Sequence, residues 1–98
     1  MEKIVIPTVT ELAKGERFVA KEMAAKADEI MPKHHANMES ILFIYQGECI
    51  IKIEGKEIHL KSGEAVSIPA LTKHQIKAIT DYKGIHFMPQ EVKFTFFK

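Results

Sequence analysis

The side chains best suited to chemistry in this sequence are its histidines and the carboxylates near them. His34, His35 and Glu39 fall within one short segment, and His74 and His86 follow in the second half of the chain. Imidazole and carboxylate groups bind divalent metals, and a catalytic metal needs about three such ligands and one open position. The sequence has no Gly-x-Ser-x-Gly, phosphate-binding loop, Cys-x-x-Cys or His-Glu-x-x-His motif, so hydrolase, nucleotide and zinc-ribbon interpretations have no support. The chemistry to consider is the binding of a metal ion or of a small molecule.

The segments that must position these side chains show the alternation typical of β-strands. Glycine recurs every eight residues at Gly47, Gly55 and Gly63, and apolar and polar residues alternate between these glycines. Period-two alternation indicates a strand with one buried face, and short, evenly spaced strands favour a sandwich or barrel. We therefore expect an all-β fold with hairpin turns at residues 54–56 and 61–63, because glycine tolerates the positive φ of such turns.

The same alternation predicts where individual side chains point. His74 shares a strand face with the apolar residues Ile76 and Ala78, so we expect His74 to face the interior. Cys49 alternates with apolar residues and is expected to be a buried, inert thiol. His59 lies on the polar side of its strand, which predicts a surface position.

Two stretches of the sequence resemble the two motifs of the cupin superfamily. Residues 31–48 carry spaced histidines, a glutamate and an apolar strand that ends in Gly-Glu, as the first motif does. The second stretch keeps Gly63, Pro69 and His74 at the family spacing. The resemblance implies a small double-stranded β-helix, a jelly-roll barrel, as a single domain over residues 1–98.

This resemblance conflicts with helix propensity in the N-terminal third of the chain. Residues 16–31 are rich in Ala, Lys, Glu and Met, which favour a helix. Their apolar positions form no helical stripe, however. The fold that the resemblance implies makes this segment mostly strand.

The resemblance also implies a metal site of three histidines and one glutamate, of which this chain keeps two residues. His34 matches the first ligand and His74 the last, whereas Ala36 stands at the second histidine and Ser40 at the glutamate. Leu71 replaces a glycine that usually follows the second-motif proline. Two histidines alone would hold a divalent ion such as Fe, Mn, Ni or Zn weakly. The candidates for a third ligand are His35, Glu39 and His86.

Two functions fit this incomplete site. The first is a small barrel that binds a small molecule, or weakly a divalent metal, in its lumen. The alternative is a metal-dependent cupin oxygenase or isomerase that has recruited a third ligand. Strand parity predicts that His34 and His74 meet in the lumen, and it places these residues on the same inner surface: Ala36, Met38, Ser40, Leu42 and Ile76.

Composition excludes several classes of partner. The 98 residues include 14 Lys and Arg against 13 Asp and Glu, so the basic excess of a nucleic-acid binder is missing. The longest apolar run, residues 41–45, is far shorter than the roughly 20 residues of a membrane span. The single cysteine cannot form an internal disulfide and fits a reducing compartment. We expect a cytoplasmic globular protein with no nucleic-acid or membrane partner.

The two ends of the chain suggest a homodimer. Residues 3–6 form a short apolar strand, and residues 92–97 include the three phenylalanines Phe94, Phe96 and Phe97. Because exposed strand edges and phenylalanines are costly in water, we expect these segments to pair two copies of the chain. The alternative is that both segments pack on their own barrel and close it at one edge.

Overall fold

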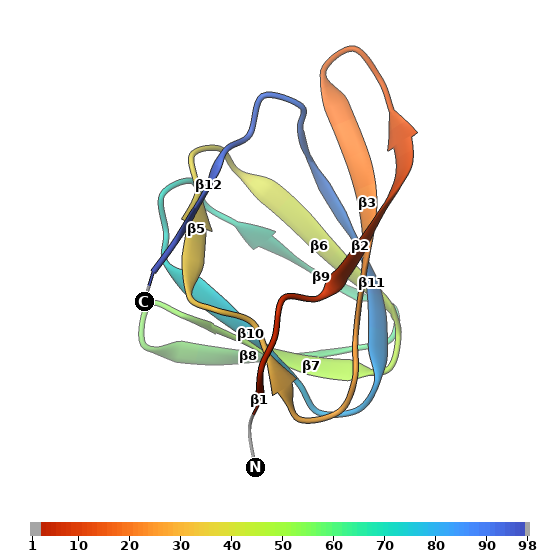
Figure 1. Ribbon diagram of the computed structural model, residues 1–98, viewed down its shortest axis with the longest axis vertical. Helices are drawn as coiled ribbons and strands as arrows, with labels where there is room; N and C mark the ends of the chain where they lie inside the picture. Colours follow the sequence, from red (N-terminus) through yellow and green to blue (C-terminus); the bar gives the residue numbers. More distant parts are fainter. Residues whose placement is uncertain (1–2, 98) are drawn as a thin grey trace.

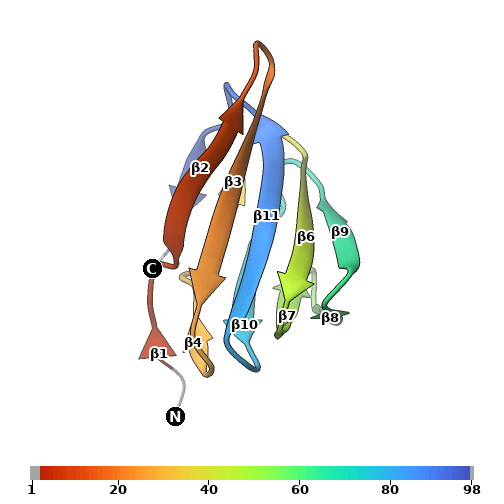
Figure 2. The ribbon, with the colours of Figure 1, turned by 90° about the vertical axis from the view of Figure 1, so that its right-hand side faces the viewer.

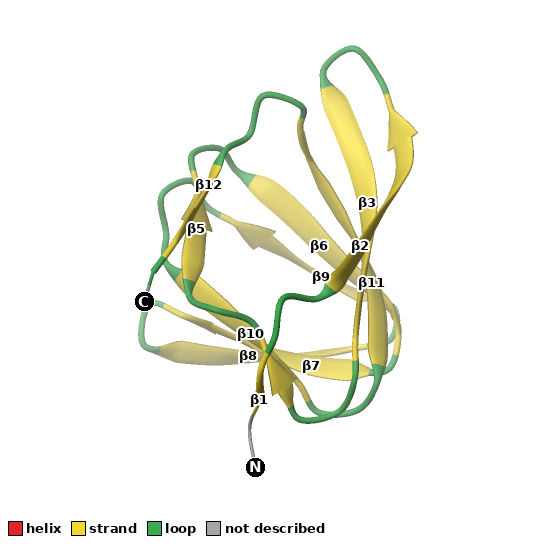
Figure 3. Ribbon diagram, viewed as in Figure 1, coloured by secondary structure: helices red, strands yellow, loops and turns green. Residues whose placement is uncertain are grey.

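The computed structural model describes residues 3–97, which form two β-sheets and no helix (Figure 1, Figure 3). Within that range no helix is long and apolar enough to cross a membrane. The strands are β1 (Lys3–Ile4), β2 (Thr8–Lys14), β3 (Phe18–Ala25), β4 (Glu29–Ile30), β5 (His34–Ala36), β6 (Ser40–Gln46), β7 (Glu48–Ile53), β8 (Lys56–Lys61), β9 (Glu64–Ile68), β10 (His74–Ala78), β11 (Tyr82–Pro89) and β12 (Phe94–Phe96). The expected all-β jelly-roll class is confirmed, and β3 lies where propensity alone favours a helix.

The first sheet has five strands in the order β2-β3-β11-β6-β9 (Figure 2). All four neighbouring pairs are antiparallel, and β11 is the central strand. Side chains at alternate positions of β11 are buried, which places Tyr82, Gly84, His86 and Met88 on the inner face. The same alternation buries Val19 and Met23 on β3, and this burial outweighs the helix propensity of the segment.

The second sheet is built around β10. Strand β7 pairs with one edge of β10 and carries β8 beyond it, while β4 and β5 both pair with the other edge. Residues 31–33 separate β4 from β5, and Pro32 in this gap has no N–H to donate to a strand ladder. The interruption matters because His34 begins β5 directly after it.

The space between the two sheets, called the barrel interior below, holds the core. Its buried apolar cluster consists of Met23, Met31, Leu42, Ile44, Cys49, Ile51, Ile53, Leu60, Ile68, Ile76, Ala78 and Tyr82. Apolar side chains at alternate positions of β6, β7 and β10 supply most of this cluster. Burial of this apolar surface is the main force that holds the two sheets together.

Glycine is required where the chain passes from one sheet to the other. Gly47 separates β6 of the first sheet from β7 of the second and has a φ of 83°. A Cβ atom at this position would lie 2.0 Å from the carbonyl oxygen of Asp81, which is far inside van der Waals contact. At the next hairpin, Glu54 and Gly55 both have positive φ, as a two-residue type I′ turn requires. The turn expected at residues 54–56 is therefore present.

Both terminal strands pair with strands of their own chain. Strand β1 runs parallel to β4, and β12 runs antiparallel to β5, with Phe96 opposite His34 and Phe94 opposite Ala36. This pairing corresponds to the alternative given for residues 3–6 and 92–97, in which both segments pack on their own barrel. The C-terminal strand thus covers one edge of the second sheet, beside the histidines.

Candidate functional site

The candidate site begins with His34 and His74, which are direct cross-strand partners on β5 and β10. Their rings lie with centroids 4.2 Å apart and planes inclined by 59°. Both side chains are buried, with exposed fractions of only 2% and 3%. The structure therefore brings together the two histidines that match the family ligand positions.

The backbone fixes the protonation form of both rings. The Nδ1 of His34 lies 2.9 Å from the carbonyl oxygen of Pro32, and the Nδ1 of His74 lies 2.9 Å from that of Thr72. A carbonyl oxygen only accepts hydrogen bonds, so each Nδ1 carries the proton and donates it. In the neutral ring, Nε2 is then an unprotonated acceptor with a free lone pair. This is the arrangement that protein histidines adopt when they bind metals through Nε2.

The Nε2 of His74 is the unusual atom of the site. It is buried and has no hydrogen-bond partner within residues 3–97. A buried polar atom without a partner costs about 1–3 kcal/mol of stability, and native proteins seldom leave one without a functional reason. The Tyr82 hydroxyl is the only other such side-chain atom in this part of the chain, and its burial raises the pKa of the phenol.

A third buried histidine faces the same interior from the opposite sheet. His86 on β11 is 4% exposed, and its Nε2 lies 2.8 Å from the Oγ of Ser40 on β6. We call His34, His74 and His86 the histidine cluster. Ser40 stands where the family motif has a glutamate, so a neutral hydroxyl bonded to His86 replaces a carboxylate in this interior.

Burial keeps the histidine cluster neutral. It lowers the pKa of His74 and of His86 to about 4 in each case, with a smaller contribution from the other histidines of the cluster. It lowers the pKa of His34 as well, against the opposing effect of the hydrogen bond to Pro32. At neutral pH the cluster therefore consists of three uncharged imidazoles.

Two phenylalanines of β12 cover the cluster from the side. The ring centroid of Phe96 lies 5.3 Å from that of His34, and the centroid of Phe94 lies 6.1 Å from His34 and 6.4 Å from His86. Both phenylalanines remain partly exposed, at 37% and 53% for Phe94 and Phe96. This strand therefore separates one side of the cluster from solvent.

The other two candidate ligands lie elsewhere. His35 points to the outer face of β5 and contacts the ring of Phe97 at a centroid distance of 5.1 Å. Glu39 is exposed and its Oε2 is 3.4 Å from the Oγ of Ser67. In the described part of the chain no three His, Cys, Asp or Glu side chains are placed so that they could hold a metal ion. Of the candidate third ligands, only His86 faces the interior.

The residues expected along the inner surface are also placed. Ala36, Ser40, Leu42 and Ile76 are buried in the barrel interior. Met38 differs because it lies in the loop between β5 and β6, where strand parity no longer applies. It is half-buried and lines a separate cleft of about 380 Å³ together with Phe18 and Pro89.

Cys49, predicted to be buried and inert, and His59, predicted to be on the surface, have matching surroundings. Cys49 is buried, and burial raises the pKa of its thiol to about 12, so the nucleophilic thiolate is absent at neutral pH. His59 is exposed and its Nε2 lies 2.9 Å from a carboxylate oxygen of Glu48. Neither residue contributes to the interior.

Sequence reasoning missed the Ser40–His86 contact and the cover formed by Phe94 and Phe96. The alternation of Tyr82, Gly84, His86 and Met88 was the signal that could have placed His86 inside, but Gly84 interrupts the apolar face and obscures the parity. No comparable signal assigns the C-terminal phenylalanines to their own barrel.

Comparisons with known proteins agree with this architecture. Residues 21–87 match the family model described as a cupin domain. A cupin superfamily protein from Desulfitobacterium hafniense has a TM-score of 0.78 and 18% identity, with 91% of this chain and 82% of that chain covered. An RmlC-like cupin with a double-stranded β-helix fold from Methanocaldococcus jannaschii has a TM-score of 0.75 and 24% identity, with coverage of 86% and 80%.

A larger enzyme also contains a similar barrel. Salicylate 1,2-dioxygenase from Pseudoaminobacter salicylatoxidans, crystallised with gentisate, has a TM-score of 0.83 and 8% identity. The alignment covers 92% of this chain but only 28% of the dioxygenase. No curated protein matches the chain in sequence. At these identities the structural likeness concerns the fold alone.

Proposed function

This chain belongs to the cupin family, and from that premise we propose that its barrel interior binds a small organic molecule that donates a hydrogen bond. The observation that carries the proposal is the unpartnered, buried Nε2 of His74, within residues 3–97. A hydroxyl or amine on a ligand would satisfy this lone pair. The ring of His34 lies beside it, and since its Nδ1 donates to Pro32, its Nε2 is a second acceptor.

The surroundings of these two acceptors favour an uncharged, flat ligand. The histidine cluster is neutral because burial lowers its pKa values, so the interior offers no fixed charge to a charged ligand. Phe94 and Phe96 add aromatic surface on the side of β12. A ligand would enter there, because β12 bonds to the sheet only through β5 and has three residues.

Phenol and toluene are suitable probes because they differ by one hydroxyl group. We expect phenol to shift the Nε2 resonances of His34 and His74 in ¹⁵N NMR spectra and to bind about tenfold more tightly than toluene. His74→Phe keeps a ring but removes the acceptor, and should abolish the preference for phenol. His59→Phe, on the surface, is the matched control and should keep it. Equal binding of both probes, or binding away from the cluster, would contradict the proposal.

Weak metal binding belongs to the same proposal. The Nε2 atoms of His34 and His74 suit a divalent ion, but His86 directs its Nε2 to Ser40, so these donors supply two ligands. The residues therefore fit a weakly held ion better than a resident catalytic metal. Metal analysis of protein purified without an affinity tag should find far less than one equivalent.

The second candidate is a metal-dependent oxygenase or isomerase. The observation in its favour is that His86 faces the same interior as His34 and His74, whose charges add to burial in lowering the pKa of His86. The similar barrel of salicylate 1,2-dioxygenase makes oxygenase chemistry the natural form of this alternative. Near-stoichiometric Fe, Mn, Ni or Zn in the purified protein would favour this enzyme over the binding barrel.

We further propose that the protein is cytoplasmic and forms a homodimer. Its single cysteine supports a reducing compartment. Apolar side chains on the outer face of the five-stranded sheet support the dimer, because Phe87 on β11 lies opposite Ile41 on β6 and both are about half exposed. Ile85 and Phe43 form the next such pair along the same strands. A second copy of the chain would bury this face.

A further inference from the structure

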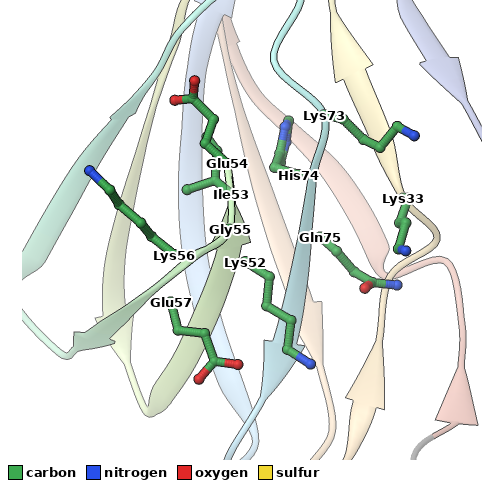
Figure 4. Close-up of a pocket in the computed structure, with 10 residues that line it drawn as sticks. All are labelled: Lys33, Lys52, Ile53, Glu54, Gly55, Lys56, Glu57, Lys73, His74 and Gln75. Atoms are coloured by element: carbon green, nitrogen blue, oxygen red, sulfur yellow. The ribbon is translucent and has the colours of Figure 1, made fainter.

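A cleft lies where the β7–β8 hairpin meets the start of β10, and His74 of the histidine cluster is among the residues that line it (Figure 4). Its volume is about 630 Å³, within the range of about 300–1,000 Å³ that is usual for small-molecule sites. The charged residues that line it are Lys33, Lys52, Lys56, Lys73, Glu54 and Glu57. We call it the lysine cleft.

The strand register brings these lysines together from separate segments of the chain. Lys52 on β7 lies opposite Glu57 on β8 and opposite Gln75 on β10. Lys33 and Lys73 immediately precede His34 and His74, which are themselves cross-strand partners. The pairing of these two histidines therefore brings the exposed Lys33 and Lys73, each just before its strand begins, to the same end of β5 and β10.

No carboxylate neutralises the four lysines by direct contact. In the described range no ion pair joins Lys33, Lys52, Lys56 or Lys73 to a carboxylate. Lys73 instead places its Nζ 4.5 Å from the ring centroid of Phe97, which holds the ammonium at the rim of the cleft. Phe97 is itself fixed by its backbone N–H, which donates to the carbonyl oxygen of Lys33 at 2.8 Å.

The cleft concentrates positive charge that the rest of the chain does not have. Four lysines and two glutamates give it a formal charge of 4 − 2 = +2, whereas the whole chain has +1. The remaining residues therefore sum to +1 − 2 = −1. A concave surface with a net positive charge attracts anions more strongly than the same charges scattered over a convex surface do.

We propose that the lysine cleft binds a small molecule that carries at least two oxyanion groups, either phosphates or carboxylates. A cleft of this size is comparable to the Debye length of about 10 Å at 0.1 M salt, so the lysines that line it attract a ligand inside it with little screening. Two oxyanions match the net charge of the cleft. The flanking carboxylates Glu54 and Glu57 would repel a long phosphate backbone that continued past the cleft, which favours a small ligand over a nucleic acid.

Pyrophosphate and citrate serve as phosphate and carboxylate probes on the full chain. In ¹H–¹⁵N NMR titrations we expect saturable shifts of the amides of residues 33, 52–57 and 73–75. Whichever probe binds more tightly identifies the oxyanion. Raising the salt concentration should weaken the binding of both.

Variants that remove lysines and variants that remove glutamates from the cleft should change the affinity for the probes in opposite directions. Lys33→Gln with Lys73→Gln should weaken binding at least tenfold, and Glu54→Gln with Glu57→Gln should strengthen it severalfold. The control Lys14→Gln with Lys83→Gln removes the same charge elsewhere and should stay within twofold of the parent. All three exchange surface side chains, and the dispersion of the NMR spectrum checks that each folds.

Three results would overturn the proposal. One is shifts that do not saturate. Another is an equal loss of affinity in the Lys14 and Lys83 control. Either of these two results would mean that the probes bind only as nonspecific counterions. The third is tighter binding of a DNA duplex than of either probe, with shifts that extend well beyond the cleft, which would assign the lysines to a nucleic-acid surface.

Discussion

Ser40 on β6 and His86 on β11 meet in the barrel interior through a hydrogen bond of 2.8 Å. Ser40 stands where the cupin motif has a glutamate. A neutral hydroxyl bonded to a neutral imidazole therefore replaces a metal-binding carboxylate at this position. A serine hydroxyl can either donate to the ring or accept from it, and it satisfies His86 in either tautomer. The interior is thus stable as a neutral site.

Replacement of this serine should destabilise the fold. Ser40→Ala would leave the Nε2 of His86 buried without its partner, which costs about 1–3 kcal/mol. Urea denaturation at pH 7 measures the change in the free energy of unfolding. Ser67→Ala, which removes an exposed and longer contact to Glu39, is the control and should change stability by less than about 0.5 kcal/mol. Equal effects of the two variants would show that the Ser40–His86 bond adds no stability.

Stability should fall with acid because of the histidine cluster. The pKa values of His74 and His86 are lowered from 6.5 to about 4 in the folded state. Between about pH 6.5 and pH 4 the unfolded chain therefore binds more protons than the folded one. The free energy of unfolding of the protein is therefore highest above pH 6.5. Between pH 6.5 and pH 4 it should drop by about 1.4 kcal/mol per pH unit for each such histidine.

Urea denaturation at pH 7, 6 and 5 measures this slope. His86→Gln should reduce the slope, because it removes one of the buried titrating groups. His59→Gln, at an exposed position, should leave the slope as it is. A slope that stays the same in His86→Gln would mean that other groups control the acid sensitivity.

Removal of the aromatic cover should make the cluster easier to protonate. Phe94→Ala would admit water beside His34 and His86, and lower desolvation should raise the pKa of both toward 6.5. An NMR pH titration of the histidine rings measures these pKa values directly. Phe87→Ala on the outer sheet face is the matched control, and the same rise in that variant would indicate general loosening of the fold.

Leu71 should be more favourable as glycine. It has a φ of 59°, in the left-handed region, at the position where the family motif usually has glycine. Removal of the Cβ strain should outweigh the added entropy of the unfolded chain and stabilise the protein by about 0.5–1 kcal/mol. Thermal and urea unfolding of Leu71→Gly test this, and Leu71→Ala, which keeps the Cβ atom, should show no such gain. A gain in both variants would point to the exposed leucine side chain rather than to the backbone.

The proposed dimer should depend on the outer face of the five-stranded sheet. Light scattering at micromolar concentration should give about twice the chain mass of 11.1 kDa. Phe87→Glu places a charge in the centre of that face and should yield monomers. Leu71→Glu adds the same charge at an exposed leucine elsewhere and should stay dimeric. A monomeric parent protein would contradict the proposal.

The sequence was sufficient for the fold because its signals are local. Alternation on β7 and β10 and the glycines at residues 47, 55 and 63 each describe one strand or one turn. The inward parity of His74 followed from Ile76 and Ala78 on the same strand. Helix propensity in residues 16–31 was misleading because β3 gains more from burying Val19 and Met23 than it loses in propensity.

The arrangement around the site was less accessible because it depends on distant segments. The sequence left His35, Glu39 and His86 open as third ligands, although His35 and Glu39 would face inward only if a bulge interrupted their segment. The packing of the two sheets is what places His86 in the interior. Phe94 and Phe96 could pair with any free strand edge, whether of the same chain or of another copy. Lys33 and Lys73 are far apart in the sequence, and they line one cleft only because β5 pairs with β10.

The eight-residue pairing of β3 with β11 has a consequence for how the protein is made. These strands are adjacent in space but occupy residues 18–25 and 82–89, so β3 lacks its central neighbour until most of the chain has left the ribosome. Contacts between such distant segments also slow folding, because a long loop must close first. Until then the apolar side of β3 is open to other chains, and yield during expression should depend more on temperature and synthesis rate than on final stability.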